Sequence, residues 1–317
     1  MIYKAKTLVS CLLLLCVSCS GKGGTKIQSV SAESVVGSEL SETVSASELF
    51  ELQMYYSTDA DRDIFDKYVA HIDELESYQE SELIIETARF FLDRPYVAST
   101  LETEPEGLVV NLREFDCTTF VETVLALSCA VINNDRPAFE DFCKQLQNIR
   151  YRRGHIGNYT DRIHYFSDWI YENENRSHVK DVTKEIGGEP YKFKLNFMSS
   201  HPDSYRQLKS NSEYIEVMQK KEIEISERDI YSIITEAKIA SCEDGIRDGD
   251  IVCFVTDIEG LDISHVGFLY RDKGIVTFIH ASSSAKKVIV NPQSISAYVE
   301  KIKRNIGLMV VRPQFWN

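Results

Sequence analysis

Three side chains suited to nucleophilic catalysis stand out in the sequence: Cys117, His265 and His280. Cys117 follows Asp116, a favoured helix N-cap residue, and apolar residues recur at helical spacing after it, so the thiol is predicted to lie in the first turn of a helix. At that position the helix dipole and the unpaired N–H groups lower the pKa of a thiol. An imidazole base, oriented by a third polar group, would complete the nucleophile.

The two histidines lie in neighbouring segments that alternate like β-strands. The midpoint between them falls between Asp272 and Lys273, so a simple hairpin centred there makes His265 and His280 direct cross-strand partners. In that arrangement one ring can bond the other and fix its tautomer. A single strand histidine is more often a packed core or surface residue, but the predicted pairing of two favours a catalytic role.

The elements that must position these residues change character along the chain. Helical spacing predicts two helices within 61–92, one starting at Asp116, and others over 136–149, 164–174 and 294–303. Segments rich in Val, Ile and Phe predict strands over 250–256, 263–270, 275–281, 287–290 and 307–311. Helices first and strands later indicate an α+β fold with a mainly antiparallel C-terminal sheet. We expect one catalytic domain over 51–317, with a helical insertion around 130–245 whose part from 177 to 243 is mixed.

The N-terminus has the features of an export signal. Two lysines precede an apolar run over 8–17 that is too short to span a bilayer, which predicts a signal peptide over 1–18. The residues that follow resemble a bacterial lipoprotein processing site with Cys19 as the lipidated residue. The Gly- and Ser-rich segment 19–50 is predicted to be a flexible tether. The expected location is the cell envelope, on the periplasmic side of the outer membrane, with the lipid on Cys19 in the membrane.

Charge and cysteine content narrow the classes further. With 35 basic and 49 acidic side chains the formal net charge is −14, so nucleic acid is an unfavourable partner. Beyond Cys19, the cysteines are Cys117, Cys129, Cys143, Cys242 and Cys253. This number is odd and no CxxC pair occurs, so one thiol stays unpaired and neither a disulfide framework nor a zinc knuckle is supported. No obligate protein partner is indicated.

Five short motifs then carry a resemblance to a known family. They are Arg-Pro-Tyr at 94–96, Phe-Asp-Cys-Thr-Thr-Phe-Val at 115–121, Gly-Asp-Ile-Val at 249–252, His-Val-Gly-Phe at 265–268 and Phe-Ile-His-Ala-Ser at 278–282. In order and spacing the sequence resembles NlpC-type papain-like peptidases, although Thr118 stands where that family has Ser or Gly. The resemblance implies that Cys117 attacks, His265 is the base, His280 is the third member and Tyr96 helps to bind the oxyanion. It implies no metal or organic cofactor.

Further segments at 101–102, 106–112, 149–151 and 161–169 resemble one branch of that family, long known only as a domain of unknown function, whose studied members are similar to N-acetylmuramoyl-L-alanine amidases. The implied substrate is a muropeptide, a small peptidoglycan fragment, cleaved between anhydro-N-acetylmuramic acid and L-alanine. The residues themselves offer a polar and aromatic set comprising Arg162, His164, Tyr165, Asp168 and Trp169. These side chains can bind a carboxylate, hydrogen-bond hydroxyls and stack on a sugar, or they can form a helix start with Trp169 in the core.

Three other functions remain open. One is an endopeptidase that cuts within the stem peptide or a crosslink. Another is a zinc amidase using His164, His265 and His280, although no HExxH motif is present and Cys117 would have no role. The third is a lipoprotein that binds muropeptides without cleaving them.

Overall fold

The computed structural model describes residues 26–28, 55–75 and 77–315. The predicted signal peptide, Cys19 and most of the predicted tether lie outside these residues. Within the tether range, β1 (Lys26–Gln28) pairs antiparallel with β2 (Tyr55–Ser57), and β2 pairs in parallel with β3 (Leu108–Val109). No described helix is long and apolar enough to cross a membrane.

The remaining elements are helices and the strands of one large sheet. The helices are α1 (Asp59–Asp73), α2 (Glu80–Phe90), α3 (Cys117–Asn133), α4 (Phe139–Arg150), α5 (Phe166–Asn175), α6 (Phe197–Ser200), α7 (Arg206–Lys209), α8 (Ser212–Glu227), α9 (Ile239–Cys242) and α10 (Ile295–Lys301). The strands are β4 (Val179–Asp181), β5 (Glu189–Pro190), β6 (Ser232–Thr235), β7 (Ile251–Thr256), β8 (Ile263–Asp272), β9 (Ile275–Ser282), β10 (Lys287–Val290) and β11 (Asn305–Pro313). Short 3₁₀ turns η1 (Arg152–Gly154) and η2 (Tyr159–Asp161) precede α5.

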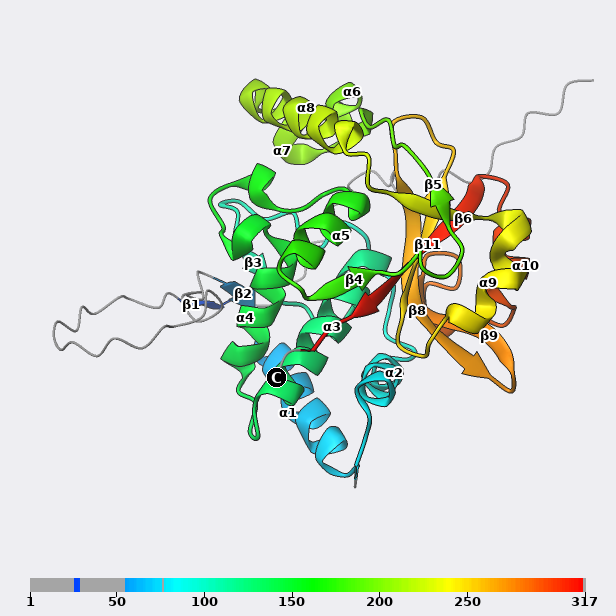
Figure 1. Cartoon of the computed structure of the whole chain (residues 1–317). Helices are drawn as coiled ribbons and strands as arrows, with labels where there is room; N and C mark the ends of the chain where they lie inside the picture. The colour runs from blue at the N-terminus through cyan, green and yellow to red at the C-terminus, as the bar shows by residue number, and fades with distance from the viewer. Residues whose placement is uncertain (1–25, 29–54, 76, 316–317) are drawn as a thin grey trace, which may run out of the picture.

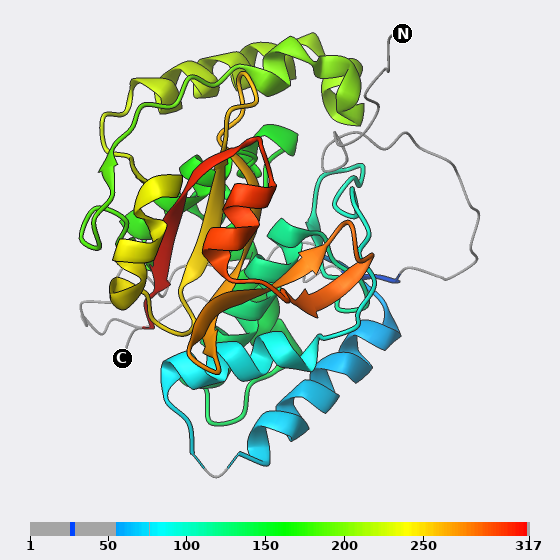
Figure 2. The same cartoon turned by 90° about the vertical axis from the view of Figure 1, so that its right-hand side faces the viewer.

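The large sheet has the order β10-β9-β8-β7-β11-β6-β5, with β4 also paired to β11, and every described pairing in it is antiparallel. Helices α1 to α5 lie on one side of this sheet, while α9 and α10 cover the other (Figures 1 and 2). Each face is apolar: Phe268 packs in the larger core cluster, Leu269 and Phe278 in the smaller one. The predicted α+β class and its antiparallel sheet are confirmed.

Helix α3 is the central helix of the larger core. Asp116 caps it as predicted: its carboxylate accepts from the Thr119 N–H at 2.8 Å, and the Thr119 hydroxyl accepts from the Asp116 N–H at 2.9 Å. Because α3 packs against α2, α4, β8 and β9, it is buried on nearly all sides. Phe120 meets Phe268 of β8 edge-on, with ring centroids 6.1 Å apart. The first turn of α3 is thereby fixed relative to β8.

The β8–β9 hairpin differs from the sequence-based expectation by its register. Asp272 pairs with Ile275, so the turn consists of Lys273 and Gly274, both at positive φ (50° and 85°). Two positive φ values are the requirement of a type I′ turn, and glycine at the second position supplies one at no cost. The turn centre is therefore one residue later than predicted. The prediction that His265 and His280 are direct partners is wrong, since the observed register places His280 across from Gly267.

The insertion that the sequence left mixed contains a substantial helical arm. Helices α6, α7 and α8 form this arm beyond the sheet; β5 precedes the arm and β6 returns the chain to the sheet after it (Figure 1). Arg228, at the end of α8, is bonded to Asp168 of α5 at 2.6 Å, and Glu222 of α8 accepts from the Tyr165 hydroxyl at 2.6 Å. Contacts between residues about 60 positions apart therefore hold the arm against α5 and the residue that precedes it.

Candidate active site

His265 and His280 form a hydrogen-bonded pair on adjacent strands. Nε2 of His265 lies 2.6 Å from Nδ1 of His280, with the rings nearly perpendicular at 83°. The contact is diagonal across the hairpin, and Gly267 makes it possible: a Cβ at that position would lie 2.7 Å from the Ile279 carbonyl oxygen and 3.0 Å from Cβ of His280. The predicted hydrogen bond between the two rings is confirmed, but it joins diagonal neighbours on the two strands and not direct cross-strand partners.

The pair is held in an uncharged state by its surroundings. Burial lowers the pKa of His265 to about 4, and burial together with His265 lowers the pKa of His280 to about 2. The ring of Phe254 is stacked with that of His265, and the ring centroids of Phe278 and His280 are 4.5 Å apart. At neutral pH one ring must therefore donate to the other. We assign the donor as His265 Nε2–H, which leaves Nδ1 of His265 unprotonated and able to accept a proton.

Cys117 is the first residue of α3 and is partly exposed. It is not in a disulfide. The other described cysteines are buried, and burial raises the pKa of Cys129 to about 12 and the pKa values of Cys143 and Cys253 well above the usual range. Position and exposure thus set Cys117 apart as the described thiol that a substrate can reach and a helix N-terminus can activate.

A continuous backbone ladder links Cys117 to the histidine strands. His280 pairs with Ile289 of β10, and the segment containing Tyr96 pairs in turn with the start of β10: the Tyr96 N–H donates to the Lys286 carbonyl at 2.9 Å. Phe115 then pairs with the Tyr96 segment, donating to the Pro95 carbonyl at 3.0 Å. Phe115 precedes Cys117 by two residues. Backbone pairing therefore runs from His280 through β10 and the half-buried Tyr96 to the residues just before Cys117.

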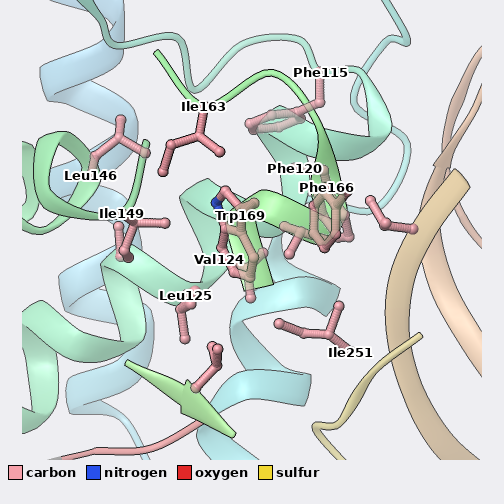
Figure 3. Close-up of a cluster of buried hydrophobic side chains, with 14 of the residues drawn as sticks. Phe115, Phe120, Val124, Leu125, Leu146, Ile149, Ile163, Phe166, Trp169 and Ile251 are labelled. Atoms are coloured by element: carbon pink, nitrogen blue, oxygen red, sulfur yellow. The ribbon is translucent and has the colours of Figure 1, made fainter. Parts of the chain in front are cut away.

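Tyr165, Asp168 and Trp169, which the sequence offered either for substrate binding or as a helix start with Trp169 in the core, are all buried. Trp169 is 1% exposed and stacks on Phe166 with ring centroids 4.7 Å apart, inside the core drawn in Figure 3. No face of its indole is left for a sugar. Asp168 is fully buried and ion-paired with Arg152 and Arg228, and the Tyr165 hydroxyl is bound to Glu222. Tyr165 and Asp168 thereby fix the arm to α5.

Arg162 and His164 lie apart from that core, next to the loop that follows Tyr96. Arg162 donates to Glu102 at 3.0 Å and lies 3.4 Å from Glu106. His164 bonds the Tyr159 carbonyl at 2.9 Å, and burial together with Arg162 holds its pKa well below the usual range. Sequence reasoning assigned no individual role to Glu102 or Glu106, although both fall in segments that resembled the amidase branch. Within the described residues, no group of three or more His, Cys, Asp or Glu side chains is arranged to hold a metal ion.

Comparison with known proteins assigns the part of the chain that contains this candidate site to a known family. Residues 86–308 match the family model of AmiA-like, N-acetylmuramoyl-L-alanine amidase-like proteins, so the chain belongs to this family. The structure is similar to that of an N-acetylmuramoyl-L-alanine amidase from Bacteroides uniformis, with a TM-score of 0.71 and 35% identity over 75% of this chain and 100% of the other. The sequence matches no curated protein.

Two other solved structures share the fold. A putative xylanase from Bacteroides fragilis is 36% identical, with a TM-score of 0.69 over 72% of this chain and 99% of that one. A protein from Legionella pneumophila is 21% identical, with a TM-score of 0.61 over 80% of this chain and 94% of that one, a likeness that extends to the fold alone. Family and amidase neighbours together indicate a hydrolase with a peptidoglycan amidase-like role.

Proposed function

We propose that the chain is a cysteine amidase with an NlpC-type papain-like catalytic domain. Its reaction is hydrolysis of the amide between N-acetylmuramic acid, in its anhydro form, and L-alanine of muropeptides. The observation that carries the proposal is the neutral His265–His280 pair, joined by the β10 and Tyr96 ladder to a thiol at a helix N-terminus. The family membership supports the class of bond.

In the first half-reaction the Cys117 sulfur attacks the lactyl carbonyl carbon while its proton passes to Nδ1 of His265. His280 accepts from Nε2–H of His265, and so orients the ring and stabilises the imidazolium that forms. In this scheme the Tyr96 hydroxyl donates to the oxyanion. Collapse breaks the C–N bond, and the amine of L-alanine leaves with the proton from His265, which gives a thioester on Cys117.

In the second half-reaction water attacks the thioester carbonyl and gives its proton to His265. The C–S bond breaks, the proton on His265 returns to the Cys117 sulfur, and the muramic acid is released as the carboxylic acid, which then loses its proton to solvent. No metal or organic cofactor takes part in this scheme. The aromatic wall around the histidines favours a base that is neutral before attack.

We also propose that the protein is exported and lipidated on Cys19, which would hold it on the periplasmic side of the outer membrane near released muropeptides. Metabolic labelling with a fatty acid tests this. Label should enter the full chain and be absent from Cys19→Ser, and equal labelling of both would refute the anchor.

The decisive experiment is mass spectrometry of the products formed from a defined anhydro-muropeptide, by the full chain and by its Cys117→Ala variant. Release by the wild type alone of a peptide that begins with L-alanine would support the amidase. Fragments cut within the peptide would replace this proposal with the endopeptidase, and an intact substrate that nevertheless binds would replace it with the binding lipoprotein.

A further inference from the structure

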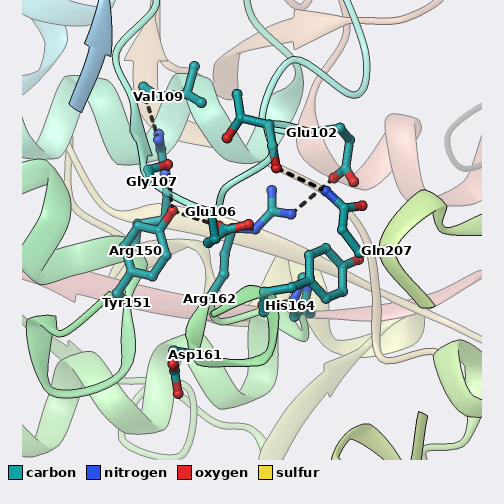
Figure 4. Close-up of polar contacts among 12 residues, drawn as sticks. Glu102, Glu106, Gly107, Val109, Arg150, Tyr151, Asp161, Arg162, His164 and Gln207 are labelled. Atoms are coloured by element: carbon teal, nitrogen blue, oxygen red, sulfur yellow. Dashed lines mark hydrogen bonds and ion pairs between the residues drawn. The ribbon is translucent and has the colours of Figure 1, made fainter. Parts of the chain in front are cut away.

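A buried polar cluster lies between the catalytic half and the helical arm. It contains Glu102, Thr103 and Glu106 from the loop after Tyr96, Arg162 from the segment after η2, and Gln207 from α7; we call these five residues the Arg162 cluster. Their side chains converge although they come from three separate segments of the chain (Figure 4).

Some polar atoms of the cluster are satisfied. Arg162 donates to Oε1 of Glu102 at 3.0 Å, and Oε1 of Glu106 accepts from the Tyr151 hydroxyl at 2.8 Å. The Gln207 amide donates to the Thr103 carbonyl at 3.5 Å. These bonds hold the loop, the Arg162 segment and the arm in one arrangement.

Other atoms of the same residues are buried with no partner among the described residues. They include Oε2 of Glu102, Oε2 of Glu106 and Oε1 of Gln207, as well as the Thr103 hydroxyl. The side chain of Glu106 is only 5% exposed and that of Arg162 only 6%. Three of these four atoms can only accept hydrogen bonds, whereas Nε of Arg162, the other cluster atom without a hydrogen-bond partner, can only donate. Because a buried acceptor that lacks a hydrogen bond is unfavourable, this arrangement is expected where a donor arrives from outside.

The charge of the cluster points to the kind of donor. Two carboxylates face a single guanidinium, so the cluster has an excess of one negative charge. Burial raises the pKa of Glu106 and Arg162 opposes this effect, which means that the carboxylate gains from a further positive partner. A ligand group with several N–H or O–H donors fits these acceptors, and a cationic ammonium also offsets the charge.

The cluster is connected to the catalytic residues. Its loop begins a few residues after Tyr96, whose neighbour Val97 bonds the Phe115 carbonyl at 2.9 Å. Both Asp116 and Arg162 lie close enough to Glu122 of α3 for their charges to shift its pKa. The side chain of Glu102 is 27% exposed, so the cluster also reaches the surface.

We propose that the Arg162 cluster is a recognition subsite that binds a donor-rich group of the muropeptide, with the free ammonium of the stem's diamino acid favoured over sugar hydroxyls. The inference rests on the proposed function, because it assigns a specificity to that same site. It also gives the helical arm a role, since Gln207 of α7 supplies one of the acceptors.

Calorimetric binding of an anhydro-muropeptide to the full chain carrying Cys117→Ala tests the subsite without turnover. Adding Glu106→Gln removes a charge at constant shape and should weaken binding about tenfold or more. Glu104→Gln is the matched control, because this neighbouring carboxylate on the same loop is 76% exposed, and it should change Kd less than about twofold.

Two ligand arms separate the sources of the donor. If the ammonium is recognised, acetylation of that amine should abolish the difference between Glu106→Gln and its parent. If the difference survives acetylation but disappears with a peptide lacking the sugar, the subsite stands and its donor is a hydroxyl. Equal Kd values for parent and Glu106→Gln with every ligand would overturn the proposal and leave the cluster occupied by water alone.

A second variant protects the test against misfolding. Gln207→Leu removes one acceptor from a half-buried position, and should weaken binding about threefold to tenfold with an unchanged melting temperature. Failure of the proposed function has a different signature. A chain that binds muropeptides through this cluster but releases no product from any of them would keep the subsite and lose the amidase.

Discussion

Two buried polar regions, the His265–His280 pair and the ion pairs of Asp168, differ in how the cost of burying them is offset. The histidines lie on strands next to each other in the sequence, stay neutral and are walled by aromatic rings. Asp168 is charged, and it meets Arg152 and Arg228 from distant segments. The neutral pair can lose or gain a proton during a reaction, whereas the ion pairs must stay paired. The first arrangement suits chemistry and the second suits anchoring.

The largest expected effect tests the chemical side of this comparison. Cys117→Ala and His265→Ala should each lower kcat/KM at least about 10³-fold, because each removes a group that reacts in the proposed mechanism. His280→Ala should leave more residual activity, since in that mechanism His280 orients the base and does not itself react. Product formation from an anhydro-muropeptide measures all three. Wild-type rates in Cys117→Ala would end the cysteine mechanism.

The anchoring side is tested by Asp168→Ala. It removes the one fully buried carboxylate from Arg152 and Arg228 and leaves them only the more exposed Glu172 and Glu224, so the free energy of unfolding should fall by about 3 kcal/mol. Glu224→Gln is the matched control: this carboxylate also pairs with Arg228 but is 67% exposed, and its loss should cost less than about 1 kcal/mol. Urea unfolding measures both. If Asp168→Ala instead kept full stability and raised KM, the substrate-binding role first expected for Asp168 would be restored.

A pH titration sharpens the contrast between neutral and charged burial. The pKa of His265 is lowered to about 4 in the folded chain, below its ordinary value of about 6.5 in an unfolded one. The unfolded state therefore binds more protons between these values, so the stability from this group is complete above pH 6.5 and is lost as the pH falls towards 4. The loss should be about 3 kcal/mol at most. Comparing unfolding of wild type and His265→Gln from pH 7 to 4 isolates it, and parallel curves would contradict it.

The sequence predicted the features that depend on local patterns better than those that depend on contacts between distant segments. Helical and strand periodicity located α3 and β7 to β11 closely, because local burial patterns dominate there. The capping residue Asp116 fixed the start of α3 as predicted. The role of Asp168 could not be predicted in the same way, because its partner Arg228 lies 60 residues away, whereas the core position of Trp169 was one of the two interpretations that the sequence left open. Gln207 left no signal, since its role depends on where α7 docks.

The smallest effect concerns the glycine on which the histidine contact depends. Gly267→Ala would place a Cβ 2.7 Å from a backbone oxygen of β9, which cannot move aside as a flexible side chain can. We expect a loss of about 1–3 kcal/mol in the free energy of unfolding and a lower kcat, because β8 and β9 must separate and the bond between the rings must lengthen. Urea unfolding and initial rates measure the two effects.

Gly274→Asn is the control on the same hairpin. Gly274 has a positive φ of 85°, which asparagine tolerates. A Cβ at this position would meet no atom within 4 Å. Its kcat should therefore match the wild type. If Gly267→Ala matched the wild type too, the diagonal contact of His265 with His280 would not be what sets the rate.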